Sequence, residues 1–183
     1  MKVDNSTLKK TIFLDRDGTI CEDASYLARV EDLRLFSFAA EAIRLLKENR
    51  FLVIVVTNQS GIGRKIFDES AMHAIHEKIQ AEIDAKIDAF YFCPHLPTEA
   101  CCCRKPNLGM IEKACADFPI DLENSWMIGD KELDIKTGFN AGVKTALVLT
   151  GYGEKTAADS GKKPNLVAKN LLEAVKKITR KCQ

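Results

Sequence analysis

The stretch FLDRDGTI places two carboxylates, Asp15 and Asp17, two residues apart and directly after a short apolar run. The apolar run predicts a β-strand, so both acids are expected where that strand ends. Gly18 lets the chain turn sharply there, and Thr19 is expected to hold the turn. Two carboxylates in this position can hold a magnesium ion beside a potential nucleophile. Because D-x-D is a common pattern, a strand followed by an ordinary acidic turn is the alternative interpretation.

The segment TNQSGIGR follows a second apolar run, FLVIVV, and begins with Thr57. The hydroxyl of Thr57 is therefore expected at the same edge of the sheet as Asp15. The polar side chains after it can donate hydrogen bonds, and the glycines let backbone N–H groups approach an anion. These residues are Asn58, Gln59, Ser60, Gly61 and Gly63. Taken alone, the segment is also compatible with a polar turn that opens a helix.

The segment GDKELD follows another strand-like run and places Asp130 at its end, with Lys131 and Asp134 close behind. Acids also favour the first turn of a helix, because the helix N-terminus carries partial positive charge. Several strand ends that carry acids or hydroxyls nevertheless predict one shared crevice, since ligands of open parallel sheets bind beyond the carboxyl ends of the strands.

The segment CPHLPTEACCCRKP contains two pairs of possible metal ligands, Cys93 with His95 and Cys101 with Cys103. Three thiolates and an imidazole form a closed tetrahedral set that favours zinc and leaves no position for water, so a structural role is expected. Cys102 would point away from the ion. A cluster of free thiols is the alternative interpretation.

Zinc would stiffen residues 93–106, called here the zinc loop. Arg104 and Lys105 directly follow its last cysteine and would be aimed into the crevice, where a cation can hold phosphate oxygens. The remaining cysteines, histidines and the tryptophan are expected to be ordinary core, surface or helix residues: Cys21, Cys115, Cys182, His73, His76 and Trp126.

Strand-like runs alternate with amphipathic helical patterns along the chain. Strands are expected at residues 11–14, 51–56, 89–92, 125–128, 145–149 and 165–168. Helices are expected around residues 40–46, 69–86, 110–118 and 171–178. This alternation predicts an α/β fold, a three-layer Rossmann-like parallel sheet with helices on both faces. Because no linker divides the chain, residues 1–183 are predicted to form a single domain.

The chain has 183 residues, 46% of them hydrophobic, and a formal net charge of +1. The length allows a buried core, and the balanced charge gives no basic field for nucleic acid. No apolar run is long enough to predict a membrane span. The opening residues MKVDNSTLKK lack the apolar core of a secretion signal, so a cytoplasmic protein is expected. The lack of an exposed heptad pattern favours a monomer.

Together, FLDRDGTI, VVTNQSGIGR, CRKP and GDKELD resemble the four signatures of the haloacid dehalogenase superfamily of phosphohydrolases. The resemblance runs from about residue 11 to residue 153. It implies Mg²⁺-dependent hydrolysis of a phosphomonoester, a small-molecule sugar phosphate, through an aspartyl-phosphate intermediate. The segment between the first two signatures is too short for the large cap domain of many members, so no such cap is expected.

The resemblance also implies roles for individual residues. Asp15 would be the nucleophile and Asp17 the general acid and base. Magnesium would be held by Asp15, Asp130 and the backbone carbonyl of Asp17. Thr57 and Lys105 would steady the transferring phosphoryl group.

The same resemblance implies which residues would meet the substrate and the structural metal. The substrate would contact Asp23, Ala24, Ser25, Tyr26, Asn58, Gln59, Ser60, Arg104 and Lys131. Structural Zn²⁺ would be bound by Cys93, His95, Cys101 and Cys103.

The zinc loop narrows the resemblance to two sister groups. One is the D-glycero-D-manno-heptose 1,7-bisphosphate 7-phosphatases of nucleotide-activated heptose biosynthesis. Its features are matched by the D-x-x-Y element at Asp23–Tyr26, by CRKPNLGM and by LVLTGYG. The other group is the histidinol-phosphate phosphatases of histidine biosynthesis, matched by CPHLP and by the short loop between His95 and Cys101.

Two hypotheses from other classes also remain open. A phosphorylatable receiver-like module would hold an acidic cluster at strand ends, but it would lack the zinc loop. A small zinc-binding interaction domain would carry carboxylates without a catalytic role.

Overall fold

The computed structural model describes residues 8–159 and 163–180 of the chain. Its strands form one parallel sheet in the order β3-β2-β1-β4-β5-β6. The strands are β1 (Lys9–Leu14), β2 (Leu52–Asn58), β3 (Ala89–Cys93), β4 (Ile120–Gly129), β5 (Lys144–Val148) and β6 (Leu166–Ala168). The helices are α1 (Ala39–Glu48), α2 (Ser60–Gly63), α3 (Glu69–Glu82), α4 (Gly109–Asp117), α5 (Glu132–Asn140), α6 (Gly153–Ala158) and α7 (Leu171–Arg180), with a short 3-10 helix η2 (Val30–Asp32).

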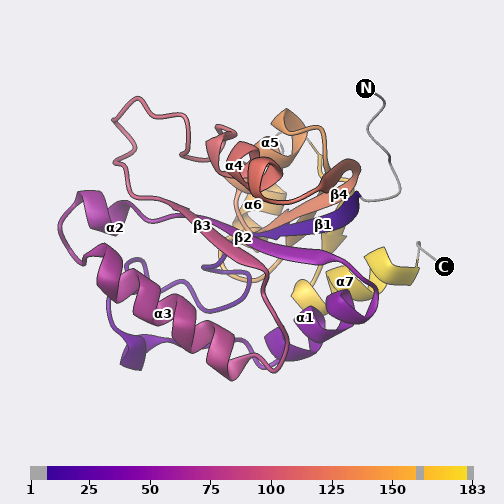
Figure 1. Ribbon diagram of the computed structural model, residues 1–183, viewed down its shortest axis with the longest axis horizontal. Coiled ribbons are helices and arrows are strands. Elements are labelled where there is room, and N and C mark those ends of the chain that lie inside the picture. The colour runs from indigo at the N-terminus through magenta and orange to yellow at the C-terminus, as the bar shows by residue number, and fades with distance from the viewer. Residues whose placement is uncertain (1–7, 160–162, 181–183) are drawn as a thin grey trace.

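Helices cover both faces of the sheet, which confirms the three-layer α/β prediction. Figure 1 shows α4 and α5 on one face and α1 and α7 on the other. Neighbouring residues of a strand point to opposite faces, so β1 contributes to two cores. Ile12 and Leu14 pack into the core beneath α1 and α7, whereas Phe13 packs into the core beneath α4. Between β1 and β2 the chain forms only η2 and α1, so no large cap is present there.

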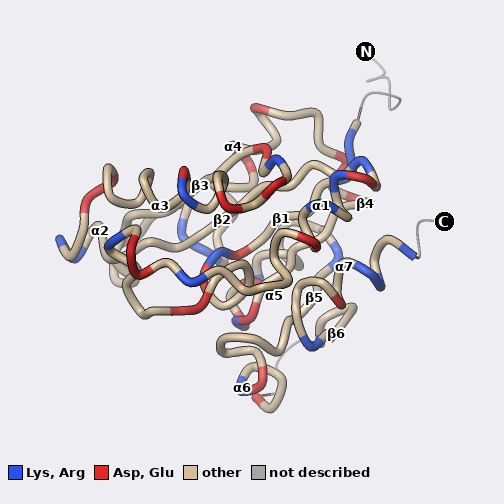
Figure 2. The backbone as a smooth tube through the Cα atoms, turned by 90° about the horizontal axis from the view of Figure 1, so that it is seen from below, with Lys and Arg blue, Asp and Glu red and all other residues tan. Residues whose placement is uncertain are grey.

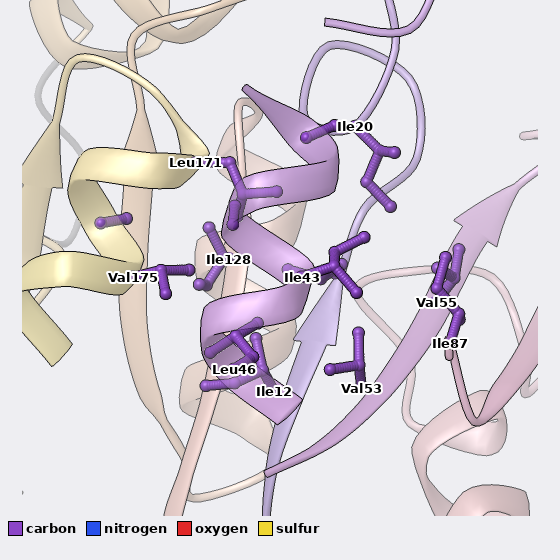
Figure 3. Packing of buried hydrophobic residues seen from close by; sticks show 14 of the residues in the cluster. Ile12, Ile20, Ile43, Leu46, Val53, Val55, Ile87, Ile128, Leu171 and Val175 are labelled. Carbon is purple, nitrogen blue, oxygen red and sulfur yellow. The ribbon is translucent and has the colours of Figure 1, made fainter. Parts of the chain in front are cut away.

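The core beneath α1 fixes the positions of the central strands. Figure 3 shows Ile43 and Leu46 of α1 between the sheet residues Ile12 and Val53 and the α7 residue Val175. All five side chains are fully buried. Since β1 and β2 both end at the edge that carries the acids, this packing holds that edge in place.

The strand order reverses beside β1. From β1 the chain moves outward through β2 and β3, and it then returns to the other side of β1 with β4, β5 and β6. In open α/β sheets, a crevice opens at this reversal, beyond the carboxyl ends of the two strands. The topology therefore places the crevice between the ends of β1 and β4.

Most element boundaries lie within one or two residues of the predicted ones, but the start of β4 and the end of α3 differ by more, for identifiable reasons. Strand β4 begins at Ile120 rather than at residue 125, because the β1–β4 register shifts and Ser125 accepts a hydrogen bond from Thr11 N at 2.9 Å. Helix α3 ends at Glu82 rather than at residue 86. The Gln80 side chain ends it by donating to the Ala85 carbonyl at 3.1 Å, and by accepting from the N–H of residue 87 at 2.9 Å.

The expectation that Thr19 holds the turn after β1 is wrong. Its hydroxyl is buried and has no hydrogen-bond partner within the described residues. The Arg16 carbonyl holds the turn instead, because it accepts from Ile20 N at 2.9 Å and from Cys21 N at 3.2 Å. Gly18 adopts a φ of +82°, which a glycine tolerates without strain.

Trp126 and Cys21 lie in the core and Cys115 is exposed, as expected. Cys182 and the first seven residues, on which the secretion-signal argument partly rests, lie outside the described residues. In the described part of the chain, no helix combines the length and apolar character needed to cross a bilayer. Figure 2 shows basic and acidic residues interspersed along the chain.

We expect Ile43→Ala to lower the free energy of unfolding by about 2–5 kcal/mol, because it leaves a cavity beneath α1. Urea denaturation monitored by circular dichroism measures this change. The matched control is Ile66→Ala, since Ile66 is 48% exposed and its truncation should change the free energy by less than about 0.5 kcal/mol. Equal effects of the two substitutions would contradict the assignment of Ile43 to the core.

Candidate active site

Three strands bring polar residues to one edge of the sheet. Asp15 directly follows β1, Thr57 lies near the end of β2, and Asp130 directly follows β4. The backbone N–H of Asp15 donates to the Ile128 carbonyl at 2.9 Å, which continues the pairing of β1 with β4 up to the acids. The shared crevice predicted from the sequence is therefore present at the strand reversal.

Asp15, Asp130 and Asp134 form a cluster of buried carboxylates. They are 5%, 0% and 1% exposed, and one oxygen of each lies within 4.8 Å of the others. Burial raises the pKa of Asp130 to about 7, and repulsion from Asp15 adds to the shift. Burial also raises the pKa of Asp134, against the attraction of Lys105. The cluster needs nearby positive charge to be fully ionised.

Lys105 brings one positive charge to this cluster. Its Nζ lies 2.9 Å from Asp15 Oδ1 and 2.6 Å from Asp134 Oδ1. Burial alone would lower the pKa of Lys105, but attraction to Asp134 and Asp15 outweighs burial and raises it. Asn58 fixes the backbone of Lys105, because it accepts from Lys105 N at 3.0 Å and donates to Lys105 O at 3.2 Å.

Asp134 is the member of the cluster to which the sequence assigned no role. One of its oxygens binds Lys105, and Oδ2 accepts from the backbone N–H of Lys131 at 3.0 Å. Lys131 is the N-cap residue of α5 and Asp134 stands three residues later. An acid at that spacing is the signal of a capping box, which turns the side chain back toward the strand end.

The carboxylate cluster fits a divalent cation. Asp130 Oδ1 is buried without a hydrogen-bond partner in the described structure, while Oδ2 accepts from Tyr152 N at 2.8 Å. A Cβ atom at Gly18 or Gly151 would lie 2.2 Å from Asp130 Oδ2, so only glycine leaves room for the carboxylate. Oxygen-only ligands of this kind suit hard cations such as Mg²⁺.

The Asp17 side chain makes different contacts from those of Asp15 and Asp130. Its two oxygens accept from Arg16, Nε to Oδ1 at 3.0 Å and Nη2 to Oδ2 at 2.9 Å. Gln59 Nε2 donates to Asp17 Oδ2 at 3.0 Å. Of the predicted magnesium residues, the structure thus gathers the side chains of Asp15 and Asp130, and Arg16 engages that of Asp17. A contribution from the Asp17 backbone carbonyl stays a prediction.

A cavity of about 190 Å³ opens beside these residues. It is lined by Asp15, Asp17, Ser25, Tyr26, Thr57, Asn58, Ser60, Arg104, Lys105, Lys131, Leu133 and Asp134. All of the predicted catalytic residues and most of the predicted substrate residues line it. The exceptions are Asp23, Ala24 and Gln59, which are absent from the lining.

Two of these exceptions hold residues that do line the cavity. Asp23 Oδ2 accepts from Lys131 Nζ at 2.7 Å, and Gln59 donates to Thr57 Oγ1 at 2.8 Å. Ala24 is exposed, and only its carbonyl accepts a local hydrogen bond. Burial alone would lower the pKa of Lys131, but Asp15 and Asp23 raise it, so Lys131 carries positive charge to the cavity wall.

The zinc-loop ligands converge as their spacing predicts. Cys93 Sγ lies 3.5 Å from His95 Nδ1 and 3.7 Å from Cys101 Sγ, and His95 Nδ1 lies 3.3 Å from Cys103 Sγ. Cys102 is exposed, outside this group. Three sulfur atoms and one imidazole nitrogen form a set that suits zinc. Arg104 is tied to the same loop, since its Nη1 donates to the His95 carbonyl at 3.2 Å.

Comparison with known proteins places the fold and the site in one family. The sequence model of the HAD-hydrolase-like family matches residues 102–174. The chain is 37% identical to a D-glycero-beta-D-manno-heptose-1,7-bisphosphate 7-phosphatase of Haemophilus ducreyi, over 91% of this chain and 97% of that protein. It is 41% identical to a protein of the same name from Helicobacter pylori, over 82% of this chain and 88% of that one.

A solved structure agrees with this assignment. It is the D,D-heptose 1,7-bisphosphate phosphatase of B. bronchiseptica, complexed with magnesium and phosphate. The TM-score is 0.88 at 32% identity, covering 94% of this chain and 99% of the other. The chain therefore belongs to the haloacid dehalogenase superfamily of hydrolases, as its four signatures indicate.

In metal-free protein at pH 8, we expect Asp130→Asn to raise the melting temperature by at least about 2 °C. The pKa of Asp130 is raised from 3.8 to about 7 in the folded state. The free energy of unfolding of the wild type therefore falls as the pH rises between those two values. Asparagine removes the buried charge. Differential scanning fluorimetry in chelator measures the shift.

The same measurement at pH 5 is the control, because Asp130 is then mostly protonated and the two proteins should melt closer together. Added Mg²⁺ should raise the melting temperature of the wild type far more than that of Asp130→Asn. An equal response of both proteins to Mg²⁺ would contradict a cation at Asp130.

Proposed function

We propose that this chain is a Mg²⁺-dependent phosphatase that removes the 7-phosphate of D-glycero-D-manno-heptose 1,7-bisphosphate through an aspartyl-phosphate on Asp15. One observation carries the proposal. Asp15 lies at the cavity wall, 2.9 Å from buried Lys105 and in one carboxylate cluster with Asp130, whose Oδ1 has no hydrogen-bond partner in the described structure. The names of the similar proteins support the substrate, and the magnesium and phosphate of the B. bronchiseptica structure support the chemistry.

The reaction would proceed in two displacements at one phosphorus atom. A carboxylate oxygen of Asp15 attacks phosphorus, and the bond from phosphorus to the sugar oxygen breaks while Asp17 gives that oxygen a proton. Water then attacks phosphorus, Asp17 takes a proton from it, and the bond to Asp15 breaks to release phosphate. Lys105 and Thr57 stabilise the charge on the phosphoryl oxygens that do not react.

Asp15, Asp130 and the Asp17 backbone carbonyl would hold the magnesium ion. When bound, Mg²⁺ supplies positive charge that offsets the repulsion between a carboxylate and a phosphoryl group. Asp134 lies close enough to add negative charge to the same site, but its ion pair with Lys105 makes it a support for that lysine.

The sugar and its remaining phosphate would contact the other residues of the cavity wall, namely Ser25, Tyr26, Asn58, Ser60, Arg104 and Lys131. Asp23 would act indirectly, by holding Lys131. Gln59 would act indirectly as well, by holding Thr57 and Asp17. Arg104 and Lys131 are the cations suited to a second phosphate, because charge-assisted hydrogen bonds are the strongest kind for that group.

The zinc loop would serve a structural purpose. Zn²⁺ held by Cys93, His95, Cys101 and Cys103 would fix the segment that delivers Arg104 and Lys105 to the cavity. A closed set of protein ligands favours this role over a catalytic one.

Histidinol phosphate is the second candidate substrate, favoured by the short loop between His95 and Cys101. We further propose a monomeric, cytoplasmic enzyme of one domain, acting without nucleic acid or membrane. The balanced charge and the lack of any membrane-spanning helix in the described residues support this setting.

The decisive test is a steady-state comparison of both anomers of heptose 1,7-bisphosphate with histidinol phosphate. We expect kcat/KM for a heptose anomer to exceed that for histidinol phosphate by at least about tenfold, a difference of about 1.4 kcal/mol.

Asp15→Asn should be inactive while keeping its fold, and activity within tenfold of wild type would exclude Asp15 as nucleophile. Phosphate release limited to one equivalent under excess substrate would favour the receiver-like hypothesis.

The zinc loop has its own test. We expect Cys101→Ser to lower the zinc content measured by elemental analysis and to lower kcat, because Lys105 is then less firmly placed. Cys102→Ser is the matched control, since Cys102 is exposed and outside the cluster, and it should keep its zinc. Wild-type protein purified without chelator and found free of zinc would overturn the assignment.

A further inference from the structure

Arg16 is a buried cation that the proposed reaction does not use. It lies between the two acids in sequence, it is 1% exposed, and it is among the largest fully buried side chains of the described residues. Burying a charged group is costly unless it is paired, and a buried ion pair is weak evidence for added stability. A role other than adding stability is therefore needed to explain why Arg16 lies next to Asp17.

The guanidinium of Arg16 is held on three sides. It binds both oxygens of Asp17 at 3.0 and 2.9 Å, and its Nη2 also donates to Gln59 Oε1 at 3.1 Å. Its Nη1 lies 3.5 Å from His76 Nε2, on helix α3. Because a guanidinium is planar and rigid, these contacts fix the plane of the Asp17 carboxyl group.

His76 supports Arg16 from the side away from Asp17. Its ring stacks on Phe90 with centroids 4.5 Å apart, and His73 meets it edge-on. Burial lowers the pKa of His76 to about 3, with repulsion from Arg16 and then His73 adding to the shift. The imidazole is therefore neutral, and its Nε2 can accept from the guanidinium.

Gln59 closes the network on the side of the cavity. Its amide oxygen accepts from Arg16, while its Nε2 donates to Asp17 Oδ2 at 3.0 Å and to Thr57 Oγ1 at 2.8 Å. One side chain thus sets the orientation of two residues that line the cavity. Cys21 Sγ, 3.7 Å from Asp17 Oδ1, approaches the remaining side of the carboxylate.

We propose that Arg16 is a positioning residue for Asp17, held in place by His76, and that it promotes proton transfer to the leaving sugar oxygen. The inference rests on the proposed function. When Asp17 gives up its proton, it becomes a carboxylate between two donors of one guanidinium, so the contacts strengthen as charge develops. Interactions that are stronger in the transition state than in the ground state raise kcat rather than lower KM.

The test compares two leaving groups. The leaving oxygen of a sugar phosphate needs the proton of Asp17, whereas p-nitrophenolate is stable without one. For Arg16→Lys, with Mg²⁺ present, we expect kcat for heptose 1,7-bisphosphate to fall about 100-fold with KM within about threefold. The first-turnover burst of p-nitrophenolate from p-nitrophenyl phosphate should stay within about threefold of wild type.

Arg29→Lys is the matched control. Arg29 binds Asp32 through the same two-point contact, at 2.8 and 3.0 Å, but it is exposed and does not line the cavity. Its kinetics should match the wild type with both substrates. Thermal unfolding of each variant shows whether it is folded.

Substitutions at His76 keep the test decisive if Arg16→Lys does not fold. His76→Phe preserves stacking on Phe90 but loses the acceptor, and we expect kcat for the sugar phosphate to fall about tenfold. His76→Gln restores an acceptor and should recover most of that loss.

Two results would overturn the inference. One is an equal fall in the p-nitrophenolate burst and in sugar-phosphate turnover, which would make the role of Arg16 structural. The other is unchanged turnover in a folded Arg16 or His76 variant. Wild-type protein that hydrolyses neither substrate would instead refute the proposed function itself.

Discussion

The burial of three carboxylates at the carboxyl ends of parallel strands is the constraint on which the site depends. Asp15, Asp130 and Asp134 lie within 4.8 Å of one another with almost no exposure to water. Packing alone cannot stabilise such a cluster, because like charges in a poorly solvated place repel strongly. Lys105 compensates part of the charge, and we propose that a cation at the Asp130 oxygen without a hydrogen-bond partner in the described structure completes the balance.

The compensating charges come from segments that are distant in sequence and held by their own contacts. Lys105 follows the cysteine–histidine cluster, and Asn58 at the end of β2 pins its backbone. Lys131 caps α5 and is paired with Asp23, which lies 108 residues earlier. The zinc loop and the N-terminus of α5 therefore act as supports that direct cations toward one cavity.

Two acids that are two residues apart end up in opposite surroundings. Asp15 faces Lys105 and the carboxylate cluster, whereas Asp17 faces Arg16 and Gln59. Different surroundings are how a fold gives two chemically identical groups different tasks. The turn after β1 creates this division, because Gly18 and the Arg16 carbonyl redirect the chain within a few residues.

The sequence alone determined the α/β class, the strand ends that carry Asp15, Thr57 and Asp130, and the four residues of the cysteine–histidine cluster. These features follow from local periodicity and spacing, which depend only on residues that are close together in the sequence. The tertiary structure alone decided that the Thr19 hydroxyl finds no hydrogen-bond partner among the described residues, that Asp134 joins the carboxylates, and that His76 meets Arg16. Those outcomes depend on which side chains the sheet order brings together, and burial and partner charge act only once that packing exists.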